Sequence, residues 1–156
     1  MALRDYHYDL HMHSCLSPCA DDDMTPNNMV NMALMCDLDI IAVTDHNAVG
    51  NCAAAMEVGR RNGLIVLPGM ELTTSEEIHV VCLFPDVGPA QAFAAGVYDS
   101  LPPIGNRPEI FGAQLLLDDQ DEPVGEEGRL LLNASSLGIY EVPAAVEALG
   151  GVAILA

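Results

Sequence analysis

Two histidines stand one residue apart near the start of the chain, in the segment YDLHMHS at residues 8–14. Successive side chains of an extended strand point to opposite faces, so His11 and His13 point the same way. Two imidazoles on one face are suited to hold a metal ion. An isolated pair is more often satisfied by backbone or water, so a predicted metal site depends on further ligands elsewhere in the chain.

The segments that position these histidines are predicted to alternate between strands and helices. The run LDIIAVT is short and β-branched, as buried parallel strands are. A helix is predicted to begin at Thr25, a capping residue followed by Pro26, and a second helix to end at Gly63. In chain order, the sequence predicts a strand at 6–11, a helix at 26–37, a strand at 38–44, a helix at 51–62 and a strand at 64–68.

The second half of the chain is less regular. A further strand is predicted at 77–84, and a helix that starts at Val142-Pro143 and stops at Gly150-Gly151 leads to a last strand at 152–156. The tract from about 101 to 140 is rich in proline, glycine and acidic residues around two apolar runs, 114–117 and 129–133. We predict that it is an insertion with a hairpin, within one domain over residues 1–156.

Four of the five histidines lie at or near the ends of the predicted strands. Parallel strands joined by helices bring functional groups to their carboxyl ends, so these residues are expected to meet. A carboxylate belongs to the same set, and imidazole with carboxylate is the usual composition of zinc, manganese and iron sites. The sequence therefore predicts a shared metal site from His11, His13, His46, Glu71 and His79. His7 lies ahead of this set and is expected to have no ligand role.

Charge is the most lopsided property of the chain, with 23 acidic residues against five basic ones and a formal net charge of −18. Such a chain repels a phosphate backbone at long range and has no basic stripe, so nucleic acid is an improbable partner. Divalent cations are better suited than nucleic acid as partners of such an acidic chain. We also expect most of these carboxylates simply to keep the surface solvated.

Composition points to a globular chain in the cytoplasm. The hydrophobic content of 51% over 156 residues is enough for a core, and no apolar run is long enough for a membrane span. The first residues lack the apolar segment of a secretory signal. The five cysteines lie in unlike settings, so we expect reduced thiols rather than a disulfide framework.

Three blocks, DLHMHS, DIIAVTDHN and PGMELTTSEEIHVV, in this order and separation, resemble the first motif blocks of the PHP family, the polymerase and histidinol phosphatase domain. The resemblance is strong from Asp9 to about Phe84, and GGVAILA resembles the strand that leads to the next block. It implies an α/β fold, a distorted TIM-like (β/α)7 barrel whose mouth holds up to three divalent ions, Zn, Mn or Fe. It also implies hydrolysis of phosphate esters.

The resemblance also implies a role for each residue. His11 and His13 would hold a first ion, which Glu71 would bridge to a second ion held by His79. His46 would hold a third, so that Glu71, His79 and His46 lie nearest the chemistry.

A further ligand is expected in the loop SCLSPCADDDMTP, which is longer than the usual version. Counting back from Pro26 selects Asp21, which is the preferred choice because it offers a hard oxygen. Counting forward from His13 lands near Cys19, whose soft thiolate would favour zinc. Asp9 and Asp45, each next to a ligand, are expected to orient ligands or form turns.

The chain departs from the family pattern at its end, where a histidine and a later Asp-x-His block are expected and do not occur. A complete barrel also needs more residues, so we expect only an incomplete amino-terminal portion of the PHP barrel. We expect these 156 residues alone to bind divalent metal weakly and to hydrolyse phosphomonoesters poorly or not at all. Two functions are consistent with the sequence. One is hydrolysis of a small soluble phosphomonoester, of a metabolite or nucleotide, by a metal-activated water. The alternative is a non-catalytic metal-binding or regulatory module of a larger assembly.

Overall fold

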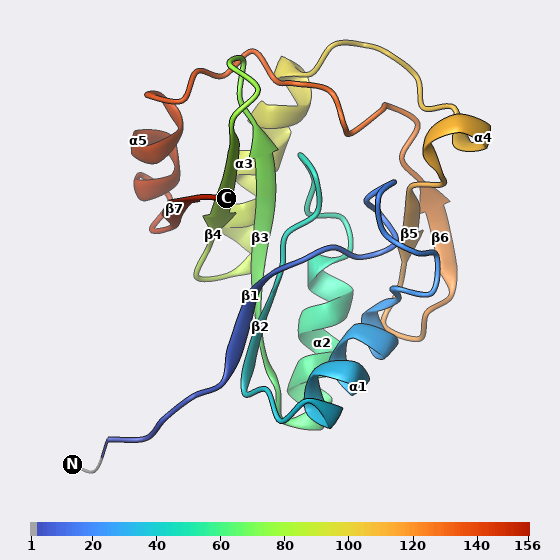
Figure 1. The fold of residues 1–156 in the computed structure, drawn as a ribbon, viewed down its shortest axis with the longest axis vertical. Coiled ribbons are helices and arrows are strands. Elements are labelled where there is room, and N and C mark those ends of the chain that lie inside the picture. Colours follow the sequence, from blue (N-terminus) through green and yellow to red (C-terminus); the bar gives the residue numbers. More distant parts are fainter. Residues whose placement is uncertain (1–2) are drawn as a thin grey trace.

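A five-stranded sheet in the order β1-β2-β3-β4-β7 forms the centre of the structure, a computed structural model that describes residues 3–156 (Figure 1). Strands β1, β2 and β3 run parallel, whereas β4 is antiparallel to both β3 and β7. Strand β7 therefore runs in the same direction as the first three. The strands span Tyr8–Met12 (β1), Ile40–Val43 (β2), Ile65–Thr73 (β3), His79–Leu83 (β4) and Val152–Leu155 (β7).

The first half of the chain has the predicted β-α-β-α-β order, with helix α1 at Pro26–Met35 and α2 at Cys52–Asn62. The hydroxyl of Thr25 accepts a hydrogen bond from the Asn28 N–H and caps α1, as predicted. Gly63 adopts a left-handed conformation with φ of 77° and ends α2. This is the backbone conformation that glycine adopts without steric cost.

Helix α3, at Val87–Ser100, was not predicted from the sequence. The Asp86 carboxylate accepts a hydrogen bond from the Val87 N–H at its start. The buried side chains Ala90, Phe93 and Val97 recur at helical spacing, so the pattern of an amphipathic helix is present. Gly88 and Pro89 in its first turn are residues typical of loops, so the sequence pattern does not indicate a helix there. None of the helices within residues 3–156 combines the length and apolar character needed to span a membrane.

The tract after α3 contains the short helix α4 (Pro108–Phe111) and a two-stranded hairpin, β5 (Leu115–Leu117) with β6 (Pro123–Glu126). The apolar run at 129–133 is not a strand. The buried Gln114 side chain holds it, donating to the Arg129 carbonyl and accepting from the Leu131 N–H. Helix α5 (Val142–Glu147) starts at the predicted residue and leads to β7.

The main core lies between the helices and one face of the sheet, and includes Met29, Ile41, Val58, Met70 and Phe93. The opposite face carries a smaller cluster of Ala42, Val81 and Leu83, with Leu10 and Leu67 packed against it. Leu10 of β1 and Ile154 of β7 line one pocket with Val81, although β1 and β7 are the two edges of the sheet. The sheet therefore curls toward this second face as an incomplete barrel.

A tight turn joins β3 to β4. The Thr74 N–H donates to the Ile78 carbonyl, and Glu77 has a left-handed φ of 60°. The register pairs Thr73 with His79 and Glu71 with Val81. Side chains alternate along each strand, so Glu71 and His79 are diagonal neighbours on one face, and the contact between them shows it.

Candidate metal centre

The Glu71 carboxylate lies at the centre of a cluster of four imidazoles, and only 7% of its side chain is exposed. Its Oε1 is 2.8 Å from Nδ1 of His79. Its Oε2 is 3.1 Å from Nε2 of His11, 2.9 Å from Nε2 of His13 and 3.5 Å from Nδ1 of His46. Residues that are far apart in the sequence thus converge on one carboxylate.

The ligand residues lie at the same end of the sheet, where the parallel strands reach their carboxyl ends. The pairing of β1 with β2 is irregular between Asp9 and Met12, next to His11, and such irregularities re-aim side chains. His46 follows β2 and forms an isolated parallel bridge with Glu71. His79 is the first residue of its strand rather than the last. Because β4 is antiparallel, its beginning lies at the edge where the parallel strands end.

The protonation states within the cluster suit metal ligands. Burial opposes the charge of Glu71, but hydrogen bonds from His13, His79 and His11 hold the pKa of this carboxyl well below its usual range. Glu71 is therefore ionised at neutral pH. Burial, reinforced by the charge of His13, lowers the pKa of His46 to about 4, so its imidazole is neutral with a free lone pair.

His46 also supplies a direct test of whether a metal ion fits. The residue is 8% exposed, and its Nδ1 makes no hydrogen bond with the described residues, although Oε2 of Glu71 lies 3.5 Å away. A buried polar atom without a partner costs free energy. A cation bound by the lone pair of this nitrogen would remove that cost. Three groups of potential ligands have their atoms within 4.8 Å of one another: His13, Cys19 and His46; His11, His13 and Glu71; and His46, Glu71 and His79. The residues present fit divalent ions.

The loop after β1 brings Cys19, and not Asp21, to this cluster. The Cys19 Sγ is 3.6 Å from Nδ1 of His13. Asp21 is exposed and belongs to none of the three groups. Its carboxylate accepts a hydrogen bond from the Asp23 N–H at 2.9 Å, which closes a turn in the run of three acids. Between the two residues considered from the sequence, the geometry favours Cys19.

Asp45 anchors this loop through hydrogen bonds. Its buried carboxylate accepts from the Ser14 N–H at 2.7 Å, the Ser14 hydroxyl at 2.6 Å and the Ser17 hydroxyl at 2.7 Å. Burial raises the pKa of Asp45, and these hydrogen bonds oppose the rise. The Ser17 Oγ also accepts from the His46 N–H at 3.0 Å and lies 3.1 Å from Nδ1 of His13. These contacts thus connect Asp45 to the backbone of His46 and to the imidazole ring of His13.

Asn51 connects the hairpin to the same loop, which the sequence did not reveal. Its Nδ2 donates to the Ser14 Oγ and to the Leu115 carbonyl, both at 3.0 Å. Its Oδ1 accepts from the Leu117 N–H. Asn51 occupies the N-cap position of α2 but makes no capping hydrogen bond with its side chain. Figure 1 shows the β5–β6 hairpin beside the loop that follows β1.

Two other polar residues lie outside the cluster. Nδ1 of His7 contacts the Asp37 carbonyl at 3.2 Å, and His7 belongs to none of the ligand groups. Arg107, an arginine of the long tract, precedes α4 and places its guanidinium 5.8 Å from the centre of the Phe111 ring.

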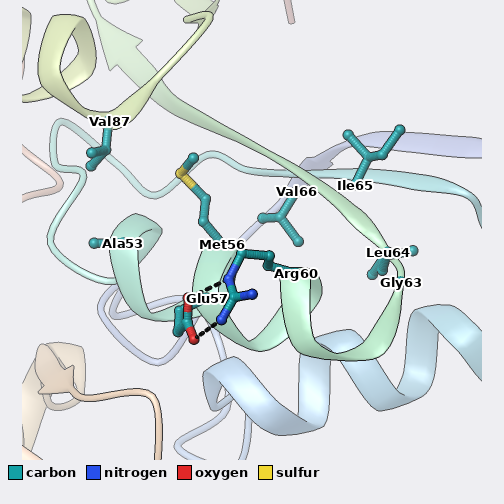
Figure 2. Close-up of a pocket in the computed structure, with 9 residues that line it drawn as sticks. All are labelled: Ala53, Met56, Glu57, Arg60, Gly63, Leu64, Ile65, Val66 and Val87. Atoms are coloured by element: carbon teal, nitrogen blue, oxygen red, sulfur yellow. Dashed lines mark hydrogen bonds and ion pairs between the residues drawn. The ribbon is translucent and has the colours of Figure 1, made fainter.

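Two pockets differ in their relation to the cluster. One, of about 340 Å³, is lined by His11 and by Asp9 beside it, together with residues of β4 and β7. Another, of about 600 Å³, lies at the start of β3 and is lined mainly by apolar side chains and by the ion pair between Glu57 and Arg60 (Figure 2). Glu71 lies toward the other end of β3, so this second pocket is remote from the histidines.

Comparison with known proteins identifies relatives that act on phosphate esters. The model of the family described as PHP domain matches residues 9–138. The 5'-3' exoribonuclease Rnm of Escherichia coli is 36% identical over 85 residues, which are 51% of this chain and 28% of that protein. The 3',5'-nucleoside bisphosphate phosphatase of Chromobacterium violaceum is 34% identical over 93 residues, 57% of this chain and 31% of that protein. The chain thus matches less than a third of the length of these relatives.

Solved structures share the fold at low sequence identity. A protein of Bifidobacterium adolescentis, described as a candidate metal-dependent phosphoesterase, superposes with a TM-score of 0.65 at 19% identity over 97% of this chain and 67% of that one. The endonuclease Q of Pyrococcus furiosus gives a TM-score of 0.64 at 16% identity, over 95% of this chain and 33% of that one. These likenesses show the fold, an incomplete PHP barrel, and the family match over residues 9–138 shows that the chain belongs to the PHP domain family.

Proposed function

We propose that this chain carries the metal site of a PHP-type phosphoesterase, which hydrolyses a phosphate ester with a metal-activated water. The observation that carries the proposal is the contact of the single Glu71 carboxylate with four imidazoles at the carboxyl edge of the sheet. Hydrolases among the relatives, a phosphatase and exoribonucleases, support it. We expect the protein to act in the cytoplasm.

The proposed ligands of up to three divalent ions, Zn, Mn or Fe, are His11, His13, His46, Glu71 and His79. Bound ions of this kind lower the pKa of water and neutralise charge on the phosphoryl oxygens. The chain's own residues prepare the site for this role. Glu71 is anionic and divides its two oxygens between His79 and the other histidines, so it is placed to serve two ions. Neutral His46 offers its unpartnered nitrogen, and Ser17 fixes the ring of His13.

We propose a small phosphomonoester, of a metabolite or a nucleotide, as the substrate. The net charge of −18 would repel a long nucleic acid. Some relatives of this chain are named exoribonucleases, so the charge argument concerns this chain alone. A nucleotide is a small phosphate ester that contains a nucleoside. It therefore shares chemical features with the substrates in the names of both kinds of relative, the phosphatase and the exoribonucleases.

A non-catalytic metal-binding or regulatory role within a larger assembly is the alternative. The observation that favours it is the share of the curated relatives that this chain matches, 28% and 31% of their lengths.

Phosphate release separates the two functions. The natural full-length protein is incubated with added Mn²⁺ or Zn²⁺ and a panel of phosphomonoesters, 3',5'-nucleoside bisphosphates and short RNA oligomers. Glu71→Gln should abolish release, whereas His7→Ala, on a histidine outside the cluster, should not change it. Activity that survives Glu71→Gln would refute the proposed site. Full metal loading without release from any ester would favour the regulatory alternative.

A further inference from the structure

Cys19 is one of two exposed cysteines, and it alone of the two lies beside the cluster. Its Sγ is 3.6 Å from Nδ1 of His13, and its ligand atom lies within 4.8 Å of those of both His13 and His46. Cys36, the other exposed cysteine, caps the end of α1 and belongs to none of the ligand groups. The remaining cysteines are buried. The chain thus contains one thiol that is both accessible and next to imidazoles.

A second and independent observation points to a ligand at this position. His46 is 8% exposed and its Nδ1 lacks a hydrogen-bond partner among residues 3–156. Nitrogen lone pairs in such positions are satisfied by a proton donor or a metal ion. The thiol and the unpartnered imidazole therefore belong to one potential site rather than to two accidental contacts.

The loop that carries Cys19 is held in place before any ion binds. The Ser17 N–H donates to the Ser14 carbonyl, and the Ala20 N–H donates to the Ser17 carbonyl, so two successive turns frame the residue. Ser14 and Ser17 are both bound by Asp45. A ligand on a fixed loop loses little conformational entropy when it binds. The position of the thiol is thus a property of the fold.

We propose that Cys19 is a metal ligand, which holds an ion together with His46, beside the ring of His13, and makes this position select zinc over manganese. The inference rests on the proposed metal site and specifies the chemistry of one part of it. When the sulfur–metal bond forms, the thiol proton passes to solvent and the thiolate donates the electron pair. Thiolate ligands favour zinc and other soft ions, whereas carboxylate and water ligands suit manganese.

Cobalt(II) is the probe for the sulfur ligand, because it replaces zinc and reports a bound thiolate through a charge-transfer absorption band in the near ultraviolet. The metal-free, reduced chain is titrated with Co²⁺ without oxygen. We expect the band in the natural chain and in Cys36→Ser, the matched control, and its loss in Cys19→Ser and Cys19→Asp. Circular dichroism verifies that each variant is folded. A natural chain that binds Co²⁺ without the band overturns the proposal even if a variant fails to fold.

Alkylation gives a second readout within one molecule. N-ethylmaleimide is added with and without saturating Zn²⁺, and the labelled residues are identified by mass spectrometry. Zinc should slow the labelling of Cys19 by at least about 10-fold, which is the smallest change in affinity usually seen when a metal site loses a supporting group. The labelling rate of Cys36 should not change. Equal labelling of Cys19 with and without bound zinc would contradict the proposal.

Metal preference tests the selectivity. We expect Cys19→Asp to weaken zinc binding by about 10–100-fold while manganese binding holds or improves. An unchanged ratio of zinc to manganese affinity would overturn the selectivity. Failure here is distinguishable from failure of the proposed function. Absence of the cobalt band from the natural chain, with intact metal content and phosphate release, removes only the role of Cys19, whereas a natural chain that binds neither Co²⁺ nor Zn²⁺ removes both.

Discussion

The buried carboxylate of Asp45 is the clearest place to test how the fold supports the cluster, and we expect Asp45→Ala to destabilise the metal-free chain. The substitution removes the acceptor of three hydrogen bonds, two from Ser14 and one from Ser17. Hydrogen bonds to a charged group contribute about 1.5–3 kcal/mol each. The two hydroxyls can turn to other acceptors, whereas the Ser14 N–H is fixed and would remain buried without a partner.

An opposing effect reduces the cost. Burial raises the pKa of Asp45, because removing a carboxylate from water costs free energy. Asp45→Ala removes this cost. The three lost hydrogen bonds outweigh that recovery, and we expect a net loss of about 3 kcal/mol, within a total of about 5–15 kcal/mol for a domain. Because Ser17 contacts the His46 N–H and the ring of His13, metal affinity should fall as well.

Urea unfolding followed by far-ultraviolet circular dichroism, on metal-free protein at neutral pH, measures the change. The matched control is Asp99→Ala, because Asp99 is an exposed aspartate near the end of α3. The control should change the free energy of unfolding by no more than about 0.5 kcal/mol. A loss of less than about 1 kcal/mol in Asp45→Ala would show that the hydrogen bonds only offset the burial of the charge. The view of Asp45 as the anchor of the loop would then be wrong.

Three further outcomes are expected. Glu71→Gln should cost more than one bound ion per chain by metal analysis, because two ligand groups share this carboxylate, while His7→Ala should leave metal content unchanged; loss of a single ion would remove the bridge. The pKa of His46 is lowered from 6.5 to about 4, so the unfolded chain takes up its proton first as the pH falls. The metal-free protein should therefore lose stability between pH 6.5 and 4, on the order of 3 kcal/mol at the acid end, and less in His46→Gln, as urea unfolding across this range would show. Gln114→Leu keeps the volume of a buried residue but leaves the Leu131 N–H and two carbonyls unpaired, so thermal and urea unfolding should show a loss of about 2–4 kcal/mol, whereas an unchanged midpoint would contradict it.

Local signals explain why the first half of the fold was predictable. Thr25 with Pro26 begins a helix and Gly63 ends one for reasons that lie within a few residues, and the structure confirms both positions. The direction of β4 was not predictable in the same way. It depends on the tight turn at residues 74–78, whose left-handed Glu77 gives no compositional warning.

The choice of ligand in the loop after β1 shows a second limit of the sequence. Counting back from Pro26 selects Asp21 and counting forward from His13 lands near Cys19, so counting alone does not decide. The path of the loop decides which side chain reaches the cluster, and that path depends on Asp45, a residue from a different strand end. Such long-range hydrogen bonds are invisible in a single sequence. Helix α3 was missed for the opposite reason, since Gly88 and Pro89 obscure a pattern that is present.

The β3–β4 hairpin also bears on how the chain folds. Glu71 and His79 are eight residues apart in the sequence, whereas Glu71 meets His11, His13 and His46 only when separate strands have paired. Contacts between near neighbours in the sequence form first, and hairpins close within about 1–10 μs. We therefore expect the Glu71–His79 pair to exist in the earliest folding intermediates, with the other histidines joining it later. An ion captured by that pair would bias refolding toward the native pairing of β3 with β4 before the sheet is complete.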